Sequence, residues 1–256
     1  MPDLNLKQYT IVLLFCLAIV SGYRYGYENI LGQMAVAILL AGATNSAIEY
    51  LRTKTWRISD SGLITGLIIA MVLAPNSSLP LAGLLSVLAI ASKYILRINN
   101  RPVFNPAAFG LMIGVLFFKA VLGWWGDYYH ILTIIAGSIL LTKYTGHWKM
   151  IFAFLANLSI LILGRALISG SSVIDQLYLI VSISSFFIFF MLTDPKTSPL
   201  LPDKFIVFGT LAAVGSFISV IFLPSALFVA GLLAADLFVP YLNYLSLQKM
   251  KHVSSA

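Results

Sequence analysis

Residues 104–118, FNPAAFGLMIGVLFF, decide how this sequence folds. After Asn105 the stretch is almost entirely apolar, yet it is shorter than the roughly 17–20 residues that a helix needs to cross a bilayer. A short apolar segment bounded by Asn, Pro and Gly is typical of a discontinuous membrane helix that lines a site near the midplane. We expect Asn105 to cap this helix and Pro106 to occupy its first position, where the missing N–H costs nothing.

The whole chain has the composition of an integral membrane protein. Of its 256 residues, 60% are hydrophobic and 10% are charged, whereas soluble domains usually carry about 25% charged residues. No stretch between the apolar segments is long enough for a soluble domain, so we expect residues 1–256 to form a single membrane domain. The formal charge of +7 is not arranged as a basic stripe interleaved with aromatic residues, which argues against nucleic-acid binding.

Ten apolar segments predict an all-α polytopic protein with about ten transmembrane helices. The segments at 60–74, 105–118 and 129–142 are short for a full crossing, and the first two in particular are expected to be broken helices. The predicted segments are 9–23, 29–51, 60–74, 79–96, 105–118, 129–142, 150–167, 173–192, 205–222 and 226–247.

Basic residues between the segments predict the orientation of the chain. With the N-terminus in the cytoplasm, the outer connections hold only Arg24 and Lys119, and the other counted Lys and Arg residues lie inside. This asymmetry follows the positive-inside rule and requires an even number of crossings, with both termini on the cytoplasmic side of the cell (inner) membrane. The outer connection 119–128 also holds Trp124, Trp125 and Tyr128, which suits an aromatic belt at the interface. The inner basic residues are Lys7, Arg52, Lys54, Arg57, Arg97, Arg101, Lys143, Lys149, Lys196, Lys204, Lys249 and Lys251, with Lys93 and Arg165 near helix ends left uncounted.

Ten crossings divide into two sets of five, about residues 9–118 and 129–247. A repeat with an odd number of crossings inserts its second copy upside down. The fifth segment opens NPAAFGLMIG and the tenth opens PSALFVAGLL, each with Pro followed by small residues. We therefore expect a 5+5 inverted repeat with broken helices.

The first of three polar clusters opens the third segment with Asp60, Ser61 and, one turn later, Thr65. Polar groups inside a bilayer are costly and tend to mark function or internal pairing. Asp60 and Ser61 could form an ordinary N-cap. Alternatively, Ser61 and Thr65 share a face with Gly62 and Gly66, which lets a flat ligand or another helix approach closely.

The other two clusters begin at Asn105 and at Thr193. A helix that starts at Asn105-Pro106 presents free N–H groups and a partial positive charge, which suits an anion or an electron-rich carbonyl; a purely structural cap is the alternative. The segment TDPKTSP at 193–199 holds two prolines four residues apart, which forbid a simple helix. Asp194 is therefore expected in a loop or broken helix, with a plain cytoplasmic turn as the alternative.

Two charged residues, Lys93 and Asp236, lie inside apolar segments. They could pair with each other, belong to an ion path, or be satisfied by snorkelling and local structural contacts. The sequence shows no metal-ligand spacing and no nucleophile–base pair, so it predicts no metal-binding or catalytic residue.

The sequence resembles the NqrB/RnfD family, whose members are membrane subunits of Rnf electron-transport complexes and of Na⁺-translocating NADH:quinone reductases. The resemblance is carried, in family order, by DSGLITGLIIAMVLAP, ASKYILRINNRPVFNPAAFG, FFMLTDPKTSP and GLLAADLFVPYLNYL. It implies a fold similar to that of urea and ammonium channels. It also implies a membrane subunit that works with partner subunits to couple flavin-mediated electron transfer to transport of Na⁺ or H⁺. Catalysis would then belong to the assembly and not to this chain alone.

The resemblance also bears on the cofactor. Members of the family carry flavin mononucleotide (FMN) joined to a threonine of an SGAT-type motif, in a long outer loop between the fifth and sixth crossings. Here that loop is KAVLGWWGDY, without threonine, so covalent FMN is not expected. A noncovalent flavin, FMN or riboflavin, near the half-helices is expected instead. The alternative is a passive channel or transporter for a small solute or cation, without redox activity. The candidate cofactor residues are Asp60, Ser61, Thr65, Asn105, Pro106, Thr193 and Asp194.

Overall fold

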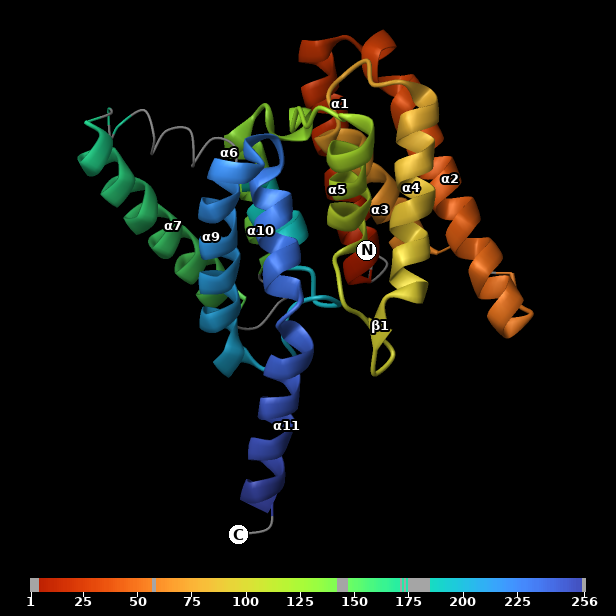
Figure 1. Ribbon diagram of the computed structural model, residues 1–256. Helices are drawn as coiled ribbons and strands as arrows, with labels where there is room; N and C mark the ends of the chain where they lie inside the picture. The colour runs from red at the N-terminus through yellow and green to blue at the C-terminus, as the bar shows by residue number, and fades with distance from the viewer. Residues whose placement is uncertain are drawn as a thin grey trace.

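The computed structural model describes residues 5–56, 59–141, 147–170, 172, 174 and 185–254. Most of these residues are helical, which confirms the predicted all-α polytopic membrane protein at this level (Figure 1). The helices are α1 (Leu6–Tyr25), α2 (Tyr27–Thr53), α3 (Asp60–Val72), α4 (Leu79–Ile95), α5 (Pro106–Phe118), α6 (His130–Leu141), α7 (Trp148–Ser169), α9 (Phe205–Phe222), α10 (Leu227–Asp236) and α11 (Val239–Ser254). Short turns are the 3₁₀ helices η1 (Trp125–Asp127), η3 (Pro202–Lys204) and η4 (Pro224–Ala226) and the π-helical turn η2 (Ile188–Leu192).

Five stretches in the described part of the chain are long and apolar enough to cross a bilayer. Their outward faces carry large apolar side chains, such as Ile168 with 91% and Phe222 with 74% of its surface exposed. Water would disfavour so much exposed apolar surface, whereas lipid chains solvate it. The chain is thus a multi-pass membrane protein. The five stretches are Leu6–Tyr25, Tyr27–Thr53, Trp148–Ser169, Pro202–Phe222 and Pro224–Gln248.

Helices α3 and α5 are short, as the sequence predicted. Each has 13 residues, which at 1.5 Å per residue reach about 20 Å, less than the roughly 30 Å of a hydrocarbon core. The helix α3 ends at Val72, and the chain continues in extended form, where Leu73 pairs with Leu122 of the outer connection. Each helix alone is therefore too short to cross that core.

Irregular backbone at membrane depth needs internal hydrogen-bond partners. At the end of α3, the carbonyl oxygen of Ala70 accepts from Nε2 of Gln33 at 2.8 Å and from Nε1 of Trp125 at 2.7 Å. Trp125 is fully buried, so the prediction that it belongs to an aromatic interface belt is wrong. Its indole instead anchors the outer connection onto the broken end of α3.

Small residues set how closely these helices pack. A Cβ atom added to Gly66 of α3 would lie 2.7 Å from the carbonyl oxygen of Ala37 in α2, and one added to Gly110 of α5 would lie 2.6 Å from that of Leu85 in α4. Gly62 also faces α2. The glycine face was expected to admit either a flat ligand or another helix, and the structure shows that another helix approaches it. Helix α5 also contacts α10 of the second half.

The structure departs from the sequence predictions at two places. Between α4 and α5 lies a small antiparallel hairpin of β1 (Arg97–Ile98) and β2 (Arg101–Pro102), because Asn99 and Asn100 both adopt the left-handed conformation of a tight turn. The predicted tenth segment 226–247 is two helices, α10 and α11, with a break after Asp236.

The larger architecture stays partly a prediction. Figure 1 shows the hairpin and the end of α11 at one end of the molecule and the connection after α5 at the other. Every predicted segment within the described residues coincides with helix, but most of 173–192, the predicted eighth segment, lies outside them. The count of ten crossings, the 5+5 inverted repeat and the channel-like fold remain predictions.

Candidate functional site

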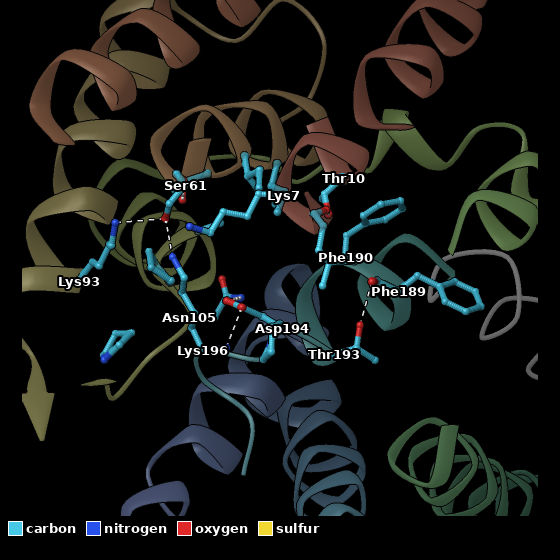
Figure 2. Close-up of a pocket in the computed structure, with 18 residues that line it drawn as sticks. Lys7, Thr10, Ser61, Lys93, Asn105, Phe189, Phe190, Thr193, Asp194 and Lys196 are labelled. Carbon is cyan, nitrogen blue, oxygen red and sulfur yellow. Dashed lines mark hydrogen bonds between the residues drawn. The ribbon is translucent and has the colours of Figure 1, made fainter. Parts of the chain in front are cut away.

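A cavity of about 230 Å³ lies where α3, α4 and α5 meet the chain around residues 189–196 of the second half (Figure 2). Apolar side chains form most of its surface, and lysine, hydroxyl and carboxylate groups from both halves supply the rest. The lining residues are Leu6, Lys7, Thr10, Ser61, Ile64, Thr65, Ile68, Lys93, Pro102, Asn105, Pro106, Ala107, Phe189, Phe190, Thr193, Asp194, Pro195 and Lys196.

Two lysine ammonium groups converge on one hydroxyl in this cavity. The Nζ atoms of Lys93 and Lys196 each lie 3.1 Å from Oγ of Ser61, although the two lysines come from opposite halves of the chain. A serine hydroxyl carries no charge, so it cannot neutralise either ammonium. Burial lowers the pKa of Lys196, and the charge of Asp194 opposes that shift. This wall of the cavity therefore presents positive charge to a ligand.

Polar residues behind the wall hold Lys93 in place. Its ammonium also donates to Oδ1 of Asn45 at 2.6 Å, and Asn45 is fully buried in α2. Nδ2 of Asn45 donates to Glu49 at 3.1 Å, and the hydroxyl of Tyr94 lies 3.1 Å from both partners. The lysine is thus oriented by a network that the sequence analysis did not identify, since Asn45 and Glu49 lie inside one apolar segment without a recognised motif.

The amino end of α5 forms a second side of the cavity. As predicted, Asn105 caps the helix by accepting the Ala108 N–H at 3.1 Å, and Pro106 is the first helical residue. The backbone N–H of Asn105 donates to Oδ2 of Asp236 at 2.8 Å, and its Nδ2 lies 3.5 Å from Oδ2 of Asp194. One residue of the first half therefore contacts two carboxylates of the second half.

The predicted break at TDPKTSP is confirmed, because η2 ends at Leu192 and residues 193–199 form turns. Oδ1 of Asp194 accepts the backbone N–H of Lys196 at 3.0 Å, which folds the loop back on itself. Burial raises the pKa of Asp194, while this N–H and the Lys196 charge oppose the rise. The alternative of a plain turn is too simple, since Thr193, Asp194 and Lys196 all line the cavity.

Arg101 on β2 fixes this loop from the other half of the chain. Its guanidinium donates to the carbonyl oxygens of Pro195 at 2.8 Å, Lys196 at 3.1 Å and Ser198 at 3.1 Å. The sequence analysis counted Arg101 only as an orienting charge. The signal that could have singled it out is its place four residues before Asn105, in the same connection that leads into the half-helix.

The predicted cofactor residues are brought together, with the exception of Asp60. Ser61, Thr65, Asn105, Pro106, Thr193 and Asp194 line the cavity, and Asp60 does not. The predicted cap at Asp60 and Ser61 is wrong: the N-cap is Ser59, without a side-chain hydrogen bond, and Asp60 is the first helical residue. The hydroxyl of Ser61 is used by the two lysines instead.

The two predicted ion-path residues occupy different places. Lys93 lines the cavity and donates to Asn45 and Ser61. Asp236 is fully buried behind Asn105. Of the alternatives left open, a pair between Lys93 and Asp236 is not formed, because each has other partners. Whether either belongs to an ion path stays a prediction.

The sequence profile of the NQR2, RnfD, RnfE family matches residues 5–127. This stretch, slightly less than half of the chain, is similar to that family. The match spans α1 to η1 and thus includes Ser61, Lys93 and Asn105 of the cavity. The match confirms the resemblance to the NQR2, RnfD, RnfE family over residues 5–127. Among proteins with curated descriptions, none matches the chain.

Proposed function

We propose that this chain is the membrane subunit of an Rnf- or Nqr-like complex and holds a noncovalent flavin in the cavity between its halves. One observation carries the proposal: residues singled out in the sequence on both halves converge on one cavity whose wall carries Lys93 and Lys196. In this role the chain couples electron transfer through the flavin to movement of Na⁺ or H⁺ across the membrane, with other subunits supplying the remaining cofactors.

The lining fits the ring system of a flavin better than the whole mononucleotide. A flavin ring is flat and apolar on its faces and polar along one edge. Ile64, Ile68 and Phe190 offer apolar surface, while Ser61 and Lys93 offer polar atoms. The volume of about 230 Å³ lies just below the roughly 300–1,000 Å³ of sites for drug-sized ligands.

The side chains of the cavity have separable roles. When bound, a flavin supplies reversible uptake of electrons and gains negative charge on reduction. Lys93 and Lys196 would stabilise that charge, because positive groups near a flavin ring tune its redox behaviour. The partial positive charge at the amino end of α5, which Asn105 begins, acts in the same direction. The apolar residues would exclude water and so strengthen these electrostatic contacts.

A covalent flavin is not part of the proposal. The outer connection 119–128 has no threonine, and Thr133, the next threonine along the chain, is fully buried in α6. We propose FMN or riboflavin held by noncovalent contacts alone.

The test is the absorbance spectrum of the purified full-length chain, recorded before and after denaturation. We expect flavin absorbance that moves entirely to the soluble fraction once the protein is denatured. The variants Lys93→Met and Lys196→Met should retain less flavin. The matched control is Lys149→Met, which removes an exposed lysine from α7. No flavin in the wild type, alone or with its partner subunits, would refute the proposal.

A passive channel or transporter is the second candidate, because α3 and α5 both begin at the cavity. Paired half-helices are a known way to build a midplane transport site. Packing beyond the cavity opposes it: the ring of Trp124 lies 6.4 Å from that of Phe187 and 6.0 Å from that of Phe228. Flux of urea, ammonium or Na⁺ into proteoliposomes without an electron donor would favour this candidate over the first.

A further inference from the structure

Asp236 ends α10 at the break before α11, and none of its surface is exposed. Its Oδ2 accepts the backbone N–H of Asn105 at 2.8 Å. Its Oδ1 is buried and has no hydrogen-bond partner within the described residues. The carboxylate thus has one satisfied and one unsatisfied oxygen, in a place that water does not reach.

A buried carboxylate in this condition is expensive. A charge removed from water costs several kcal/mol unless it is paired and fully hydrogen-bonded. The carboxyl end of a helix carries partial negative charge, so the position of Asp236 at the end of α10 adds to the cost. Some positive charge must compensate it.

The basic side chains that line or flank the cavity, Lys7 included, form no ion pair with Asp236 among the described residues. Lys93 and Lys196 direct their ammonium groups to Ser61, and Arg101 directs its guanidinium to loop carbonyls. The ion pairs found among the described residues do not include Asp236. The nearest carboxylate in the hydrogen-bond network is Asp194, which shares Asn105 with it. Other titratable residues on the adjoining elements include Lys204, Tyr241, Tyr244 and Lys119, and no hydrogen bond or ion pair found among the described residues joins them to Asp236.

We propose that Asp236 is the binding site of a monovalent cation, H⁺ or Na⁺, which neutralises it. Divalent ions are disfavoured, because one carboxylate balances only one of their two charges and no group of three or more His, Cys, Asp or Glu that could hold a metal ion occurs in the described part of the chain. A single carboxylate with one N–H donor on its other oxygen suits one positive charge.

The site is placed to respond to charge in the cavity. Asn105 contacts Asp236 through its backbone and Asp194 through its side chain, and Asp194 lines the cavity. Negative charge that enters the cavity would favour a bound cation at Asp236, and its removal would favour release. This link to electron transfer rests on the proposed function, whereas the cation site itself does not.

The experiment uses the full-length chain in lipid nanodiscs without added flavin. Infrared spectroscopy detects the C=O band of a protonated carboxylic acid, and equilibrium binding of radioactive sodium detects Na⁺. The variants are Asp236→Asn, which keeps an acceptor for the Asn105 N–H, and Asp236→Glu, which keeps the carboxylate. The matched control is Asp203→Asn, because Asp203 is an exposed acid in an ion pair with Lys204.

We expect one of two signals in the wild type: a carboxylic acid band, which assigns a proton, or saturable sodium binding, which assigns Na⁺. That signal should vanish in Asp236→Asn, persist in Asp203→Asn and shift in Asp236→Glu, because the longer side chain moves the carboxylate. Neither signal in the wild type, or an unchanged signal in Asp236→Asn, overturns the proposal. If Asp236→Asn does not fold, the comparison is made with Asp236→Glu. A signal in Asp236→Glu identical to that of the wild type then overturns the proposal. Flavin binding is measured separately, so each proposal can fail alone.

Discussion

Replacing Arg101 by methionine should loosen the second-half wall of the cavity without touching its lining. The guanidinium donates to three loop carbonyls, those of Pro195, Lys196 and Ser198, and Met can donate to none. A hydrogen bond from a charged donor contributes about 1.5–3 kcal/mol, and the half-buried position lets water replace part of it. We therefore expect a loss of about 2–3 kcal/mol in the free energy of unfolding, a fall of about 4–12 °C in melting temperature.

Two assays measure this effect on the purified chain. Thermal unfolding followed by intrinsic fluorescence gives the melting temperature, and limited trypsin digestion reports how often the backbone at Lys196 opens. The control is Arg97→Met on the same hairpin, whose guanidinium donates to Asn100 within that turn. It should cost less, about 1 kcal/mol or less, because Arg97 is half-buried like Arg101 but donates only within its own turn. Arg101→Lys should resemble Arg101→Met, because an ammonium lacks the planar fork of donors.

Equal melting temperatures and digestion rates for the Arg101 and Arg97 variants would refute this reasoning. They would mean that the loop at 193–199 holds its shape through the Asp194 turn and its packing alone. The contacts of Arg101 would then be incidental to the cavity.

Three further predictions concern other parts of the site. Gly66→Ala should destabilise the chain by about 1–3 kcal/mol, seen as a lower melting temperature, because the new Cβ would lie 2.7 Å from the Ala37 carbonyl oxygen; an unchanged value would mean that α3 is free to shift. Asn105→Ala should cost about 1 kcal/mol through loss of the cap, and Asn105→Asp, which can still cap, should recover part of it. At the outer connection, burial raises the pKa of Asp127 against the hydrogen bonds from Ser185 and the Phe186 N–H. The native state therefore binds this proton more tightly than the unfolded state does. The stability that this proton contributes is complete below the ordinary pKa of Asp and is lost as pH rises through the raised value. Over that pH range the free energy of unfolding of the wild type should fall relative to that of Asp127→Asn. Parallel curves of unfolding free energy against pH for the two proteins would contradict this.

The sequence predicted the membrane class, the short helices and most of the polar residues of the cavity because these depend on local patterns. Apolar runs end where Asn105-Pro106 and the two prolines of 193–199 interrupt them. Such interruptions leave polar groups without hydrogen-bond partners, which is costly inside a bilayer. Two such interruptions must find partners, and the simplest partners are each other. The convergence of Asn105 and Asp194 on one cavity is the result.

The sequence could not predict contacts that depend on how the halves pack. The role of Ser61 changes from a helix cap to a shared acceptor because Lys196 approaches it from the other half of the chain. Arg101 looked like one of many loop charges until the loop at 195–198 lay beside it. The hairpin and the break after Asp236 were missed for a different reason: both occur within stretches whose composition suits a continuous helix or a plain loop.

The most direct test of the central claim is a flavin titration of the flavin-free protein, followed by quenching of flavin fluorescence. Riboflavin and FMN should each bind saturably to the wild type and to Lys149→Met if the cavity accepts the ring system. A lost charge-assisted contact is worth about 1.4 kcal/mol or more, so Lys93→Met and Lys196→Met should bind about tenfold more weakly. Equal affinities in all four proteins, or no saturable binding to the wild type, would contradict a flavin site between the two halves.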